Sequence, residues 1–110
     1  MQVSAFIERV RPEIGDKTEP YRWANTAFLK PLSDGEREIV SRVPEAKYVS
    51  AITTSALTEH AAVTEDVLVT DDYFNALLHY VAFRILSELQ DAGNIAAAKE
   101  HYGLFREEFR

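Results

Sequence analysis

The stretch VTDDYFNALLHYVAFRILSEL, residues 69–89, carries the strongest helical pattern in the 110-residue chain. Thr70 or Asp71 is suited to cap its start. Asp71 and Asp72 form an acidic pair that suits the positive N-terminal end of the helix dipole. Gly93 is well placed to stop the helix. We therefore predict a helix that starts at this acidic pair and runs to about Leu89.

This predicted helix is apolar nearly all the way round, whereas an ordinary surface helix carries a broad polar face. After its first turn the polar residues are only Asn75, His79, Arg84, Ser87 and Glu88. Three other short helices can hardly cover such a rod, so we expect part of it to contact another subunit. The alternative is a central helix surrounded by its own chain. The residues assigned to the subunit interface are Tyr73, Leu77, Tyr80 and Phe83.

The N-terminal residues 3–14 also place apolar side chains at helical spacing, which predicts a short first helix. Ser4 is a possible cap, and Pro12 is a late helix breaker. The segment GDKTEP, residues 15–20, is rich in polar and turn-forming residues and is predicted to be a surface loop. It leads to the chain's only tryptophan, Trp23, which we interpret as an aromatic anchor.

Residues 25–43 predict a second helix, because their apolar residues recur every three to four positions. Pro31 disturbs this pattern, since proline cannot donate a backbone hydrogen bond and crowds the preceding turn. We expect a kink or a break there, with Ser33 or Asp34 capping a new helix. Pro44 then ends the element.

Two further segments complete the predicted architecture. Residues 47–69 are rich in Val, Ile and Thr without a helical stripe, and predict short strands or an irregular arm. From Asn94, a good cap, a final amphipathic helix follows. Its apolar stripe consists of Ile95, Ala98, Tyr102, Phe105 and Phe109. The predicted fold is mainly α: one domain, residues 1–110, forming a small four-helix bundle with a short β-prone or irregular excursion between helices 2 and 3.

Composition and charge argue against several classes of protein. The formal net charge of −6 argues against sequence-independent DNA binding, which requires clustered Lys and Arg. The absence of cysteine excludes disulfides, thiolate catalysis and Cys-ligated zinc. No apolar run reaches the length needed to span a bilayer, so we expect no membrane partner and no export signal.

The three histidines, His60, His79 and His101, are the obvious candidates for acid–base or metal chemistry. Their possible acidic partners are Glu59, Glu65, Asp66, Asp71 and Asp72. None of them lies in a metal-ligand motif, and phosphate-binding glycine loops and nucleophile elbows are missing. We expect structural histidines, with no catalytic residue, no metal and no cofactor; a metal or catalytic site is the minor alternative.

Two blocks of the chain resemble small head-tail connector (adaptor) proteins of tailed bacteriophages. YRWANTAFLKPLSDGEREIVSRVPEA, residues 21–46, resembles their early pattern of Arg-Trp, a leucine-rich helix, a QREIV-like run and R-P-D/E-A. The later residues resemble their closing helix pair, Y-x-x-A-L-x-x-Y-V-x-x-R-x-x-S followed by A-G-N-x-x-x-A-x-x-H-Y. The chain departs from the family at Ala24, where Ser or Thr is usual, and at Pro31, where an aromatic or aliphatic residue is common. The matching residues of the later block are Tyr73, Ala76, Leu77, Tyr80, Val81, Arg84, Ser87, Ala92, Gly93, Asn94, Ala98, His101 and Tyr102.

The resemblance implies a non-enzymatic structural subunit of a homo-oligomeric ring, dodecameric in the family, that docks under the portal protein. It implies that the ring receives a tail or nozzle protein below and leaves a channel through which DNA passes without specific binding. An acidic chain suits such a channel. The implied location is the head-tail interface of the virion, and the host cytoplasm during assembly.

Portal or tail binding is assigned to the cationic, hydrophobic C-terminus, where related connectors use C-terminal segments to grip the portal. The assigned residues are Phe105, Arg106, Phe109 and Arg110. Alternatively, the aromatic stripe of this helix packs on the third helix of the same subunit, Phe105 more than Phe109. Two other functions stay open: a tail-completion or stopper protein, and a small helical regulatory protein that binds a host or phage factor.

Overall fold

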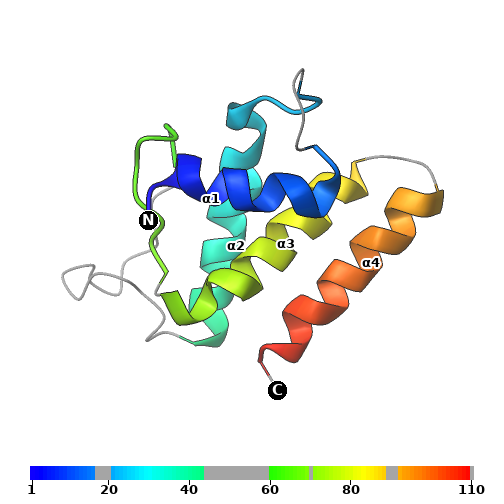
Figure 1. Ribbon diagram of the computed structural model, residues 1–110. Coiled ribbons are helices and arrows are strands. Elements are labelled where there is room, and N and C mark those ends of the chain that lie inside the picture. Colours follow the sequence, from blue (N-terminus) through cyan, green and yellow to red (C-terminus); the bar gives the residue numbers. More distant parts are fainter. Residues whose placement is uncertain (17–20, 44–59, 70, 89–91, 110) are drawn as a thin grey trace.

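The computed structural model describes residues 1–16, 21–43, 60–69, 71–88 and 92–109, and these residues are mainly helical (Figure 1). This confirms the predicted mainly α fold with four helices. The α-helices are α1 (Val3–Val10), α2 (Leu29–Arg42), α3 (Phe74–Ser87) and α4 (Ala92–Glu107). Short 3-10 helices are η1 (Arg11–Ile14), η2 (Asn25–Phe28) and η4 (Asp71–Tyr73).

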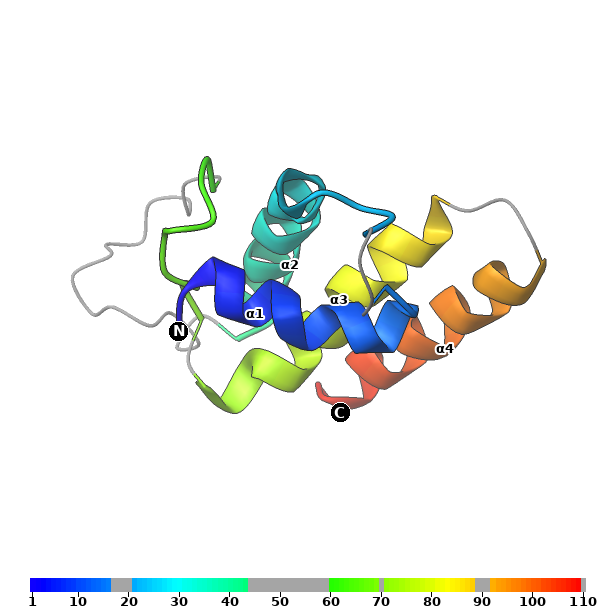
Figure 2. The same cartoon turned by 45° about the horizontal axis from the view of Figure 1, so that its top comes forward.

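Helix α3 lies at the centre of this arrangement and contacts α1, α2 and α4. Helices α3 and α4 run antiparallel beside each other, and α1 crosses in front of α2 and α3 in both views (Figures 1 and 2). Six residues of α3 are buried in the core of the chain itself: Ala76, Leu77, Val81, Ala82, Ile85 and Leu86. The apolar circumference of α3 is thus largely explained by its central position in its own chain.

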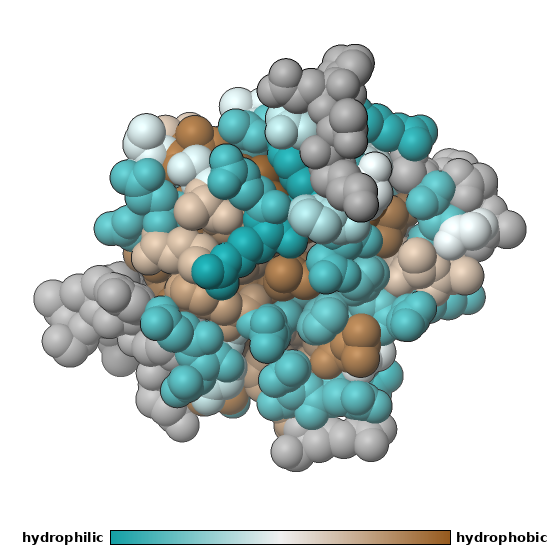
Figure 3. Space-filling view, in the orientation of Figure 1, coloured by the Kyte–Doolittle hydropathy of each residue, from teal (hydrophilic) through white to brown (hydrophobic). Residues whose placement is uncertain are grey.

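The core draws on all four helices and on the segment before α3. Helix α1 contributes one complete apolar face, and α4 contributes Ala98 and Phe105. Val67 and Val69 close the core from the irregular segment 60–69. On the face shown in Figure 3, hydrophilic side chains cover most of the surface and hydrophobic ones lie in separate patches. No helix among the described residues is long and apolar enough to span a membrane.

Helix α1 begins without a side-chain cap, so the prediction of Ser4 as a cap is wrong. Ser4 lies inside the helix, and its N–H donates to the carbonyl of Val63 at 3.0 Å. The N–H of Val3 donates to the carbonyl of Glu65 at 2.8 Å. Backbone carbonyls of a distant segment thereby satisfy free N–H groups at the helix start. At the other end the chain tightens into η1, which has Pro12 in its first turn.

Helix α2 differs from the prediction of a helix recapped after Pro31. The chain is 3-10 helical through Phe28, and the α-helix starts at Leu29. Pro31 therefore lies in the first turn, where a missing N–H costs little. Ser33 and Asp34 are not caps. The Ser33 hydroxyl donates to the carbonyl of Leu29 at 2.9 Å, and Asp34 instead accepts a hydrogen bond from α3.

The boundary between α3 and α4 also differs from the local sequence signals. Helix α3 is preceded by η4 and has no side-chain cap, so the prediction of Asp71 as a cap is wrong. Helix α4 begins at Ala92, which places both Gly93 and Asn94 inside its first turn rather than at its boundaries. Packing between the two helices outweighs the local capping preferences here. Thr70 and Leu89 lie outside the described residues.

The β-prone excursion can be assessed only over its last part, because residues 44–59, including Pro44, lie outside the described residues. Residues 60–69 are irregular, as one of the two predicted alternatives required. Within the described ranges no strand forms, and Gln2 and Asp66 make an isolated antiparallel bridge. The N–H of Val67 donates to the carbonyl of Met1 at 2.9 Å, so this segment is held against the N-terminus.

Candidate functional site

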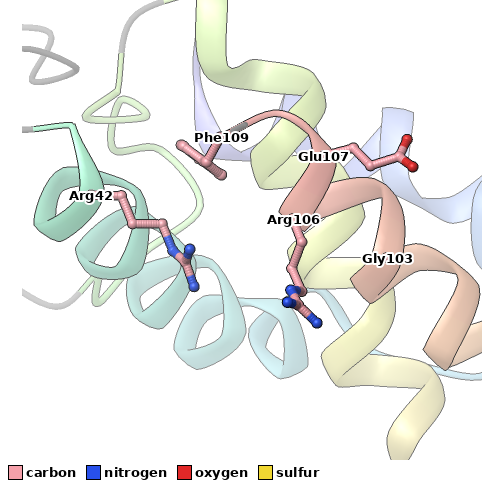
Figure 4. Close-up of a pocket in the computed structure, with 5 residues that line it drawn as sticks. All are labelled: Arg42, Gly103, Arg106, Glu107 and Phe109. Atoms are coloured by element: carbon pink, nitrogen blue, oxygen red, sulfur yellow. The ribbon is translucent and has the colours of Figure 1, made fainter.

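The ends of α2 and α4 border a cleft of about 370 Å³, shown in Figure 4. Arg42 comes from the last turn of α2, and the other lining residues come from the end of α4 and just beyond it. The two guanidinium groups reach into the space between the helices, whereas Glu107 points away from them (Figure 4). The lining residues are Arg42, Gly103, Arg106, Glu107 and Phe109.

Aromatic packing fixes the wall of this cleft. Phe105 is fully buried, and its ring lies 5.2 Å from that of Tyr80 and 5.1 Å from that of Phe109, edge to face in both cases. Phe109 also stacks on Tyr73, with ring centroids 6.2 Å apart and an angle of 8° between the planes. Such pairs add to the stability gained by burial alone. Phe109 is therefore held by two aromatic neighbours although it lies beyond the end of α4.

The cleft is cationic on one side and aromatic on the other. The guanidinium of Arg42 lies 5.5 Å from the ring centroids of both Phe105 and Phe109, within cation–π range. Arg42 also pairs with Glu38, one turn earlier, at 3.2 Å. Arg106 lies over Tyr102 at 6.0 Å and is exposed, and no carboxylate among the described residues forms an ion pair with it. This arrangement can bind a carboxylate next to an apolar side chain.

The residues predicted for portal or tail binding divide into three groups. Arg106 and Phe109 do line the cleft. Phe105 belongs to the core of the subunit, so it supports the cleft from behind and presents no surface to a partner. Arg110 lies outside the described residues. Sequence reasoning missed Arg42, because nothing in α2 by itself indicates that its last turn lies beside the end of α4.

The residues predicted for the subunit interface lie mainly between α3 and α4. Tyr73, Tyr80 and Phe83 are half-buried, and each packs on an aromatic ring of the C-terminal helix or its end. Leu77 is completely buried and is therefore a core residue, unable to reach another subunit. The partly exposed rings of the other three can still form part of a contact, and the subunit interface stays a prediction.

His60 forms a buried bridge between two carboxylates. Its Nε2 lies 2.6 Å from Glu36 Oε1, and its Nδ1 lies 2.9 Å from Glu65 Oε1. The N–H of Leu68 donates to the second oxygen of Glu36. The backbone N–H of His60 donates to the Ser33 hydroxyl at 2.8 Å. Since both ring nitrogens are engaged, this imidazole has no free nitrogen for proton transfer to a substrate.

The two carboxylates also set the protonation of this bridge. The hydrogen bond and negative charge of Glu36, with a smaller contribution from Glu65, raise the pKa of His60 against the opposing effect of burial. The hydrogen bond from His60 lowers the pKa of Glu65, helped by hydrogen bonds from two backbone N–H groups. A charged imidazolium between two carboxylates is the favoured state, and it fastens segment 60–69 to α2.

A second buried ion pair organises the tryptophan loop. Arg11 and Asp16 are almost completely buried and lie 2.6 Å apart. Arg11 also donates to the carbonyl of Trp23 at 3.0 Å and to the side chain of Asn25 at 2.6 Å. Asp16 accepts from the N–H groups of Arg22 and Trp23. The loop prediction therefore placed Asp16 wrongly at the surface, because its buried cationic partner lies in the preceding helix.

Comparisons with known proteins add no assignment: no family model, curated protein or solved structure matches this chain. No set of three or more His, Cys, Asp or Glu side chains within the described ranges is arranged to hold a metal ion. The cleft between α2 and α4 is therefore the candidate site on geometric and chemical grounds alone.

Proposed function

We propose that this protein is a structural subunit of a phage head-tail connector ring, which docks under the portal and joins the head to the tail. The proposal rests first on the resemblance of residues 21–46 and 73–102 to that family. The structural observation that supports it is the cationic, aromatic cleft at the end of α4, where the resemblance places portal or tail binding. The location that follows is the head-tail interface of the virion, reached from the host cytoplasm during assembly.

The chemistry of the cleft specifies the kind of segment it would bind. Two guanidinium groups beside Phe109 favour a portal or tail segment in which an acidic residue is next to an apolar one. The rings around Phe109 are already packed in the free subunit, so little side-chain freedom would be lost on binding. Such a preorganised aromatic surface suits a long-lived contact with the portal or tail segment.

Ring formation would use the partly exposed side of the α3–α4 pair. Tyr73, Tyr80 and Phe83 are half-buried there, and Ile95 of α4, which is 38% exposed, lines a small hollow together with Phe83. Apolar side chains left on the surface of a small subunit are suited to a subunit contact. By analogy with the family the ring would be dodecameric, and the net charge of −6 would let DNA pass without adhering.

The proposal is tested by measuring the mass of the purified chain in solution, with and without a purified phage portal protein. Size-exclusion chromatography with light scattering should show a ring, or a complex with the portal ring. Binding to a tail protein alone would favour a tail-completion or stopper protein. A chain that stays monomeric and does not bind the portal protein would favour a regulatory protein. An enzymatic activity that is abolished by a chelator would favour an enzyme.

A further inference from the structure

A pair of histidines, one on α3 and one on α4, joins these two helices outside the lining of the cleft between α2 and α4. His79 on α3 and His101 on α4 place their Nδ1 atoms 3.1 Å apart, with the rings tilted by 33°. Both side chains are half-buried. In the metal-free protein one ring nitrogen donates this hydrogen bond and the other accepts it. The two Nδ1 atoms therefore face each other directly between the helices.

The separation of these nitrogens is close to that of two ligands on one metal ion. Imidazole binds Zn²⁺ at about 2.0–2.1 Å, so two nitrogens in a tetrahedral shell lie about 3.3 Å apart. The observed 3.1 Å is close to this separation, and an ion would replace the hydrogen bond after both partly exposed rings turn to direct their nitrogens at it. We propose that His79 and His101 are the protein ligands of a binding site for a divalent transition-metal ion such as Zn²⁺. This proposal is independent of the connector function.

The surroundings suit a neutral imidazole and a cation. Burial, together with the neighbouring His101, lowers the pKa of His79, although the negative charges of Glu13 and Glu108 oppose this shift. A neutral ring is the form that binds metal. Glu13 from η1 and Glu108 beyond α4 also give this place a negative field, which attracts a cation. Among the described residues no third ligand is in position, so water would complete the shell, and binding should be weaker than at a closed structural zinc site.

A bound ion would fasten α4 to α3 close to the aromatic wall of the cleft between α2 and α4. His101 lies one turn before Phe105, and His79 precedes Tyr80, the ring on which Phe105 packs. Bridging the two histidines would therefore hold the aromatic wall of the cleft. Because the ion binds only the folded chain, the melting temperature should rise with its concentration.

Isothermal titration of the full chain with ZnCl₂, together with thermal unfolding, tests the site. We expect one Zn²⁺ per chain, an increase in Tm with zinc, and no such increase with MgCl₂. His79→Gln and His101→Gln should each weaken zinc binding at least about tenfold. Glu100→Gln is the matched control, because it removes an exposed charge beside His101 and should leave zinc affinity unchanged.

The proposal would be overturned by equal zinc affinity in the wild-type chain and both histidine variants, or by an equal loss in Glu100→Gln. Histidine NMR signals of the unmodified chain give the same test without any substitution. Zinc should shift the imidazole signals of His79 and His101 and leave those of His60 unchanged. Shifts confined to His60, or absent from all three, would contradict the assignment even if a variant failed to fold.

Discussion

His60 Nε2 lies 2.6 Å from Glu36 Oε1, and both side chains are buried, so this hydrogen bond helps to tie α2 to the segment that leads into α3. With Glu65 on the other ring nitrogen, the bridge holds residues 60–69 in place. The same segment supplies backbone carbonyls to the start of α1. This imidazole therefore contributes to the relative positions of α1 and α2, and its contribution can be measured through the free energy of unfolding and its pH dependence.

Glu36→Gln should lower the free energy of unfolding by about 1–3 kcal/mol, because a buried charge-assisted hydrogen bond is weakened. The pKa of His60 is raised in the folded state, so its stabilisation is fully present below its ordinary value of 6.5 and is lost as pH rises through the folded-state value. Urea unfolding over this range should show falling stability in the wild type and a smaller fall in the variant. If the free energy of unfolding changed with pH equally in the wild type and in Glu36→Gln, this account of the bridge would be contradicted.

Gly35→Ala should destabilise the protein although alanine favours helices. A Cβ at this position would lie 2.8 Å from Leu77 Cδ1 and from Tyr80 Cδ1, so these two buried or half-buried side chains, or α3 itself, would have to shift. Such overpacking costs about 1–3 kcal/mol. Gly103→Ala on α4 is the matched control: its Cβ meets nothing within 4 Å, and it should stabilise by roughly 0.5–1 kcal/mol. Chemical denaturation compares the two, and equal effects would show that α2 and α3 are not packed this closely.

Phe105→Ala should lower the free energy of unfolding by about 3–5 kcal/mol, because it empties a fully buried position between α3 and α4. Leu104→Ala, one residue earlier and 38% exposed, should change stability by only about 0.5 kcal/mol. The comparison uses two apolar residues of one helix and separates burial from helix propensity. A small effect of Phe105→Ala, similar to that of Leu104→Ala, would mean that α4 does not pack on α3 through this ring.

Phe83→Ala tests the interface proposed for the ring. The side chain is half-buried against Tyr102, with ring centroids 4.7 Å apart, so its loss should leave a folded subunit of reduced stability. We expect the larger effect on assembly, visible in light scattering as a folded monomer where the wild type forms the ring. A variant that assembles like the wild type would remove Phe83 from the interface.

The sequence predicted the four helices because each carries a clear periodic stripe, but it misplaced their ends. Ser4 was a plausible cap, yet the start of α1 is satisfied by carbonyls more than 50 residues away along the chain. Pro31 was expected in the interior of a helix and lies in a first turn, which only the extent of η2 reveals. Local rules cannot include such long-range partners.

The candidate site was predictable only in the part that α4 supplies. Arg106 and Phe109 follow from the cationic, aromatic end of the chain, whereas Arg42 approaches them through tertiary packing. Two further features of the sequence indicate tertiary contacts that the sequence analysis did not predict. Glu36 lies on the apolar stripe of α2, which indicates a buried carboxylate in need of a partner. His79 and His101 are about equally far from the α3–α4 connection, so an antiparallel helix pair brings them together.

The most direct test of the connector proposal is the affinity of the Arg106→Glu variant for the portal protein, measured by biolayer interferometry. Arg106 is exposed in the cleft, so the variant should fold normally. Arg9→Glu, the same charge change at an exposed position of α1, is the matched control. The account predicts at least about tenfold weaker portal binding for Arg106→Glu and unchanged binding for Arg9→Glu. Equal affinity of both variants and the wild type, or no binding by the wild type, would contradict it.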